Sequence, residues 1–91
     1  LQGKKFAIFG LGDQIGYPEN FCDAIGILAE VIEQCGGSVV GYTPIAYYTF
    51  EASKAQRGEE FVGLPLDQEN QPRMTKNRIK RWVDQIKEEF K

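Results

Sequence analysis

The stretch that decides the fold lies near the start of the chain and reads Phe6-Ala7-Ile8-Phe9-Gly10-Leu11-Gly12-Asp13-Gln14-Ile15-Gly16-Tyr17-Pro18. Its first four residues are apolar on both faces, which is the pattern of a central parallel strand, here predicted over 4–9. Three glycines and a proline then predict a loop that ends near Pro18. A buried strand that feeds a glycine-rich loop is typical of α/β folds.

Downstream patterns predict an alternation of helices and strands. Apolar residues at helical spacing predict a helix over 20–35, and the β-prone run 38–42 predicts a second strand. The run 61–66 predicts a third strand, at a sheet edge because Pro65 has no N–H to donate. This alternation predicts a parallel α/β sheet whose ligands bind beyond the carboxyl ends of the strands.

The segment 43–60 and the end of the chain carry only local signals of secondary structure. Residues 43–50 are aromatic and β-prone, and the polar run 51–60 is compatible with a helical turn. The final helix is predicted over 76–90, with Thr75 as its N-cap. Its basic residues stand beside acidic ones, so a solvated face is favoured over a nucleic-acid patch.

Composition excludes several functional classes. The chain has 91 residues, 42% hydrophobic and 26% charged, so it forms at most one small domain and is no disordered or low-complexity segment. A net charge of −2 gives no basic excess for nucleic acid, and no apolar run approaches the roughly 18 residues of a membrane span. Because the chain opens at Leu1 and not at Met, we expect it to be part of something longer.

Histidine and cysteine usage narrows the chemistry further. The absence of His removes Ser–His–Asp and Cys–His catalysis within the chain. Cys22 and Cys35 alone cannot build a zinc site, and along one helix they would lie about 20 Å apart, too far for a disulfide. We therefore expect two free thiols that serve as packing residues, in a cytoplasmic protein.

The spacing of the glycines in the loop is a weak nucleotide signal. Gly10 and Gly12 fit the G-x-G-x-x-G dinucleotide pattern, but Ile15 stands at the third glycine and Gly16 comes one residue late. A P-loop sequence is also absent from the chain. Spacing alone favours the view that the glycines merely turn the chain from strand to helix.

The wider string from Phe6 to Ala24 closely resembles the second flavin-binding loop of bacterial and algal flavodoxins. The resemblance continues in register at Gly36-Gly37, Phe50-Glu51-Ala52-Ser53-Lys54-Ala55, Phe61-Val62-Gly63-Leu64, Asp67-Gln68-Glu69-Asn70-Gln71 and Arg78-Ile79-Lys80-Arg81-Trp82-Val83. It implies a flavodoxin-like three-layer α/β fold with a parallel sheet, represented over 1–91 by its carboxyl-terminal strands and two helices. The chain is similar to the long-chain subgroup, with 43–60 as the insertion into the last strand.

The resemblance implies an electron-transfer protein and not an enzyme: a low-potential, one-electron carrier that holds FMN and serves reductases and acceptor enzymes. It implies six cofactor-binding residues, which are Leu11, Gly12, Asp13, Tyr17, Asn20 and Cys22. Tyr17 would lie flat against the isoalloxazine ring, because an electron-rich aromatic face stacks well on oxidised flavin. The others would meet the ring edge, where acidic neighbours disfavour the reduced anion.

The resemblance also implies what the chain lacks. The family's phosphate loop and second ring-flanking loop have no counterpart in the sequence, which leaves half a flavin pocket and no phosphate site. The free edge of strand 4–9 then predicts a homodimer, or a need for the complementing amino-terminal half. The alternative function is a flavin-free structural or assembly module that reuses half of the fold.

The aromatic residues after position 45 leave two questions open. Tyr47 stands where family members often have Gly, so the resemblance implies strain or a changed loop there. Tyr47, Tyr48 and Phe50 either form a surface for a partner or cover the edge of the split strand.

Overall fold

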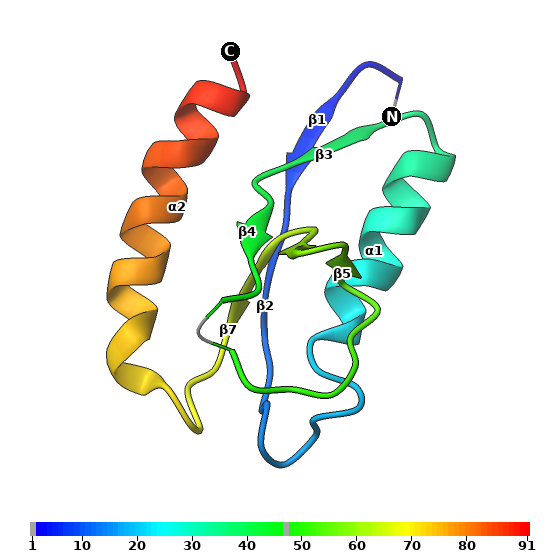
Figure 1. Ribbon diagram of the computed structural model, residues 1–91. Coiled ribbons are helices and arrows are strands. Elements are labelled where there is room, and N and C mark those ends of the chain that lie inside the picture. Colours follow the sequence, from blue (N-terminus) through cyan, green and yellow to red (C-terminus); the bar gives the residue numbers. More distant parts are fainter. Residues whose placement is uncertain (1, 47) are drawn as a thin grey trace.

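The computed structural model describes residues 2–46 and 48–91, so the expectation for Tyr47 lies outside the described residues. Two helices flank a layer of short strands on opposite sides (Figure 1). The elements in chain order are β1 (Lys5–Ala7), β2 (Phe9–Leu11), α1 (Asp23–Gln34), β3 (Ser38–Val40), β4 (Thr43–Pro44), β5 (Gln56–Arg57), β6 (Glu60–Phe61), β7 (Leu64–Leu66), the 3₁₀ helix η1 (Pro72–Met74) and α2 (Thr75–Glu89).

The predicted strand 4–9 is two short strands that continue to Leu11. β1 pairs in parallel with β3, and β2 pairs in parallel with β7. Ile8 lies between β1 and β2, and its carbonyl accepts a hydrogen bond of 2.9 Å from the Leu64 N–H. The predicted parallel α/β arrangement is therefore confirmed, with a break where the chain passes from one partner strand to the other.

The prediction that Pro65 marks an edge strand is confirmed. β7 pairs only with β2 among the described residues, and it carries Pro65 at its centre. The prediction that strand 4–9 is buried on both faces is wrong for this chain. Phe9 is 64% exposed and Leu11 is 71% exposed, because Trp82 of α2 packs on the leucines of β7 and leaves these two side chains of β2 largely uncovered.

The main core lies between α1, together with the loop before it, and the segment 42–62. Phe21 and Phe61 are completely buried, with their rings 5.8 Å apart. The rings of Tyr48 and Phe50 pack on both of them at 5.1–5.7 Å. Tyr48 and Phe50 thus pack against the core, an arrangement that neither of the two alternatives for them described.

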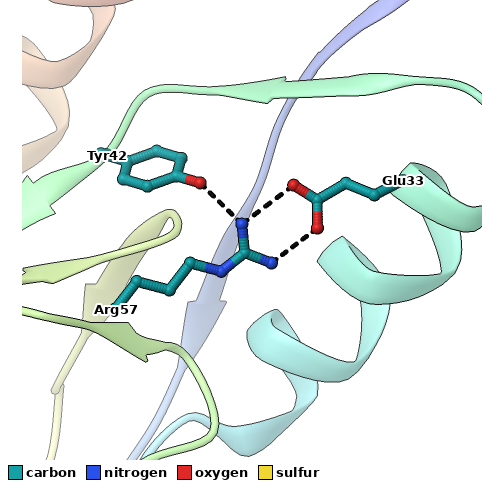
Figure 2. Close-up of polar contacts among 3 residues, drawn as sticks. All are labelled: Glu33, Tyr42 and Arg57. Atoms are coloured by element: carbon teal, nitrogen blue, oxygen red, sulfur yellow. Dashed lines mark hydrogen bonds and ion pairs between the residues drawn. The ribbon is translucent and has the colours of Figure 1, made fainter.

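The polar run 51–60 contains two short strands, at 56–57 and from 60 onward, joined by turns, and no helix. β4, β6 and β5 make a small antiparallel sheet, and Gly58 turns the chain with φ at +64°, a conformation that glycine adopts without strain. Arg57 ties this sheet to α1 (Figure 2): its guanidinium donates to Glu33 at 2.6 and 2.9 Å and to the Tyr42 hydroxyl at 2.7 Å. The hydrogen bonds from Arg57 hold the pKa of Glu33 below its ordinary value.

Both helices begin and end within a few residues of the predicted bounds. α1 begins at Asp23 and not at 20, because Cys22 before it adopts a left-handed conformation with φ 52°. The prediction of Thr75 as N-cap is wrong: η1 runs directly into α2, so Met74 is the N-cap, and the Thr75 hydroxyl bonds the Gln68 side chain.

Both cysteines are free, as expected, but only Cys22 is buried. Cys35 is exposed at the end of α1, so its predicted packing role is wrong. Neither helix in the described part of the chain is long and apolar enough to cross a membrane. The described residues also contain no group of three or more His, Cys, Asp and Glu side chains able to hold a metal ion.

Candidate functional site

A surface depression of about 330 Å³ opens beside the loop that follows β2, at the carboxyl end of that strand. Parallel α/β sheets bind their ligands at this end of the strands. The residues that line it are Leu11, Gly12, Asp13, Tyr17, Asn20, Cys22, Asp23 and Ala24. All six residues that the sequence singled out for a cofactor therefore line one depression.

The carboxylate of Asp13 shapes the loop between β2 and Tyr17. Its Oδ1 accepts hydrogen bonds from the N–H groups of Gly16 at 2.7 Å and Ile15 at 3.2 Å, and its backbone carbonyl accepts from the Tyr17 N–H at 2.9 Å. A Cβ on Gly16 would lie 2.5 Å from Asp13 Oδ2, so a side chain there would displace the Asp13 carboxylate from this arrangement. The bond from Gly16, followed by one from Asn70, holds the pKa of Asp13 below its usual value.

A buried carboxylate fixes this loop to the end of β7. Asp67 is completely buried, and its Oδ2 accepts a hydrogen bond of 2.9 Å from the Gln14 N–H. Asn70 donates to Asp67 and also to Asp13 Oδ1 at 2.6 Å. Burial alone would raise the pKa of Asp67, but the bonds from Gln14 and Asn70 outweigh it and leave the pKa below its ordinary value.

Sequence reasoning missed the supporting role of Gln14, Asp67 and Asn70. Gln14 is 2% exposed, and its side-chain oxygen accepts from the Thr49 N–H. The signal was present in the sequence: Asp67 and Asn70 follow a predicted strand, and carboxyl ends of neighbouring parallel strands share one edge of a sheet. These three residues hold the loop that carries Tyr17.

Gly12 and Cys22 bring the two sides of the depression together. A Cβ on Gly12 would lie 2.5 Å from Cys22 Sγ and 2.8 Å from the Phe21 ring, so only glycine allows this approach. Cys22 has φ 52°, a conformation that is strained for a residue with a side chain. Burial raises the pKa of its thiol to about 12, so the thiol stays protonated and packs without serving as a nucleophile.

Segment 51–54 supports the far wall of the depression. The carbonyl of Pro18 accepts from the N–H groups of Glu51 at 2.7 Å and Ala52 at 2.9 Å, and the Lys54 N–H donates to Asp23 Oδ1 at 2.8 Å. Asp23 Oδ2 accepts from the Asn20 side chain at 3.2 Å. The Asn20 amide is therefore already positioned against α1.

The depression offers an exposed aromatic face and unused backbone donors. Tyr17 is 69% exposed. The N–H groups of Asp13 and Cys22 donate no hydrogen bond to the described residues. The lining holds the carboxylates of Asp13 and Asp23 and no Lys or Arg. This combination suits a planar, uncharged ring with acceptor atoms on its edge, and it does not suit a phosphate.

Comparisons with known proteins agree with this geometry. A family profile described as Flavodoxin matches residues 1–82. The chain is 60% identical over 90 residues to a flavodoxin of Synechococcus elongatus, covering 99% of the chain and 53% of that protein. It is 58% identical to a flavodoxin of Nostoc sp. with the same coverage, and 49% identical to Flavodoxin 1 of Escherichia coli, covering 99% of the chain and 52% of that protein.

Solved structures match at the level of the backbone. The structure of Fusobacterium nucleatum flavodoxin bound to flavin mononucleotide superposes with a TM-score of 0.94 at 41% identity, and the match covers 99% of the chain and 54% of that structure. The chain thus spans about half the length of the curated relatives it matches. Since the family profile covers residues 1–82 and the flavodoxin fold is reproduced throughout the matched part, the chain belongs to the flavodoxin family.

Proposed function

We propose that residues 1–91 correspond to the carboxyl-terminal half of a long-chain flavodoxin, with 43–60 as the insertion, and that they supply the ring-edge half of an FMN site. The complete protein is then a cytoplasmic, low-potential, one-electron carrier between redox partner proteins. The observation that carries this proposal is the single depression lined by all six expected residues. The FMN-bound structure of the relative at 41% identity supports it.

The residues of the depression fit a flavin ring better than other ligands. The exposed face of Tyr17 stacks on the ring, and the free N–H groups of Asp13 and Cys22 are donors for carbonyl oxygens on its edge. FMN supplies the one-electron chemistry, while the chain binds the ring, orients it and sets the charge around it.

The charges of the depression imply that the ring and the phosphate of FMN are bound by different halves of the site. Asp13 and Asp23 repel a phosphate, so the FMN phosphate is held by residues outside this chain. The lowered pKa of Asp13 keeps its carboxylate charged near neutral pH. A fixed negative charge beside the ring disfavours added electrons, which fits a low reduction potential.

FMN titration of the purified chain tests the proposal. The chain alone should quench FMN fluorescence weakly, and it should bind tightly once the amino-terminal half of the Synechococcus elongatus relative is added as a separate polypeptide. The expected signs are full quenching and a shifted visible spectrum. No quenching in either sample, with both polypeptides folded together, contradicts the proposal and favours the flavin-free assembly module.

Substitution of Tyr17 tests the ring contact within the complemented protein. Tyr17→Ala should weaken FMN binding about fivefold, as expected for the loss of an aromatic pair worth about 1 kcal/mol, and should raise the potential of the second electron. Tyr17→Phe is the matched control, since it keeps the aromatic face and should bind FMN nearly as well. Equal binding by the alanine variant would remove Tyr17 from the site.

A further inference from the structure

A second cavity lies between α2 and β4, two elements that stand next to each other in Figure 1. Its volume is about 230 Å³, and it shares no lining residue with the depression at Tyr17. Its walls are mainly apolar, formed by Pro44, Leu64, Met74 and Trp82. The proposed FMN site therefore does not account for it.

The charge of this cavity is entirely positive. Arg78 and Arg81 line it, and the described lining residues include no carboxylate. Neither arginine has an ion pair in the described part of the chain. Burial raises the pKa of Tyr48, the remaining ionisable lining residue, to about 12, so its phenol is neutral and offers no counter-charge.

The other polar side chains of the lining already donate to backbone carbonyls. The donor–acceptor pairs are Thr43 to Gly63 at 2.6 Å, Tyr48 to Pro65 at 2.6 Å, Trp82 to Gly41 at 2.7 Å and Gln85 to Tyr42 at 2.8 Å. Gln85 Nε2 keeps a second N–H, and the charged donors that remain for a ligand are those of the two arginines.

Arg78 is the more unusual of the two. Its guanidinium lies 4.0 Å from the centre of the Tyr48 ring. Its Nη1 and Nη2 atoms are shielded from solvent and have no hydrogen-bond partner among the described residues. A desolvated cation with unused donors is costly, and an aromatic face compensates for only part of that cost. An anion within reach of Arg78 would remove this deficit.

We propose that this cavity binds a small organic anion, a carboxylate carried on a compact apolar or aromatic body. The guanidinium of Arg78 turns from the Tyr48 ring toward the cavity and donates two parallel hydrogen bonds to the carboxylate. The exposed Arg81 adds a second positive charge. The apolar body packs against Leu64 and Trp82. The proposal goes beyond FMN binding and is independent of it.

Benzoate is the probe that tests this site, with benzamide as its neutral isostere and inorganic phosphate as an anion without an apolar body. The ¹⁵N-labelled chain is titrated alone and with the unlabelled amino-terminal half of the relative, so that only this chain gives signals. Benzoate should shift the indole N–H of Trp82, the only tryptophan of the chain, and the amides of Ala46 and Gln85. Benzamide and phosphate should bind at least tenfold more weakly.

Variants assign the effect to the arginines. Arg78→Lys keeps the charge but loses the two-pronged geometry, and Arg81→Gln removes a charge from an exposed position that the fold tolerates; each should weaken benzoate binding about tenfold. Arg73→Gln is the control, because Arg73 is exposed and outside the cavity lining. FMN binding should stay unchanged in all three.

Three results would each overturn the proposal. The first is equal binding of benzoate and benzamide. The second is benzoate affinity unchanged within twofold in both Arg78→Lys and Arg81→Gln. The third is an absence of shifts at Trp82 in the folded protein. Since FMN binding is measured separately, failure here leaves the proposed function standing.

Discussion

β2 and β7 are paired strands with opposite environments. Phe9 lies in register with Leu64, and Leu11 lies in register with Leu66. Side chains in register on neighbouring strands point to the same side of the sheet. Yet both leucines of β7 are 3% exposed, whereas Phe9 and Leu11 of β2 are 64% and 71% exposed.

The difference in exposure arises because α2 packs over β7 and leaves β2 largely uncovered. Trp82 forms a buried cluster with Leu64 and Leu66, but it meets Phe9 only edge-on, with ring centres 6.2 Å apart. The large apolar residues of β2 are therefore not explained by packing within the described residues. They fit the proposal that another half of the fold lies against this edge.

Alanine substitutions at matching positions of the two strands should give the largest difference in the free energy of unfolding. Leu66→Ala should lower the free energy of unfolding by about 2–4 kcal/mol, because it leaves a cavity under α2. Leu11→Ala should lower it by less than about 0.5 kcal/mol in the chain alone, because most of that side chain already contacts water. Urea unfolding followed by circular dichroism measures both.

The same two variants should behave differently once the amino-terminal half is present. Leu11→Ala should then cost about 1–3 kcal/mol, as its side chain becomes covered, while the cost of Leu66→Ala should change little. A Leu11 variant that stays neutral in the complemented protein would show that the added half does not cover β2.

The next largest effect concerns the carboxyl ends of these strands, where Asp67 joins them. Asp67→Asn replaces one acceptor by a donor that faces the N–H of Gln14 or the amide of Asn70, and it should cost about 1–3 kcal/mol. The pKa of Asp67 is lowered on folding, so its stabilising contribution is complete above the unfolded value of 3.8 and is lost as the pH falls below it. The variant should therefore show a weaker loss of stability on acidification.

Unfolding curves of both proteins between pH 7 and pH 2.5 check this expectation. Asp23→Asn is the matched control: this carboxylate also bonds a backbone N–H, but near the surface. Curves for Asp67→Asn and the unsubstituted chain that stay parallel down to pH 2.5 would contradict the assigned role of Asp67.

The six residues that the sequence singled out line one depression because they are close along the chain. Leu11 to Cys22 span one strand-to-helix connection, so local spacing was enough to bring them together. The supports of the loop were not predicted, because Asp67 lies 53 residues from Gln14 and only pairing of β2 with β7 makes them neighbours.

The exposure of β2 was not predictable from its residues for a related reason. An apolar run such as Phe6 to Phe9 indicates that a strand is suited to burial, but it does not indicate which element covers it. The expectation of a helical turn in the polar run 51–60 was wrong for another reason. The hairpin that forms there depends on the positive φ of Gly58 and on contacts of Arg57 with α1.

The smallest expected effect concerns the ion pair that ties β5 to α1. Arg57 and Glu33 have side chains that are 35% and 39% exposed, so solvent screens their attraction, and a double-mutant cycle with Arg57→Met and Glu33→Gln should give a coupling of about 0.5–1 kcal/mol. The pair between Lys91 and Glu88 is 72% and 73% exposed and is the control, with coupling near zero. A coupling between Arg57 and Glu33 that survives 1 M salt unchanged would assign their interaction to the two short-range hydrogen bonds and not to screened charge attraction.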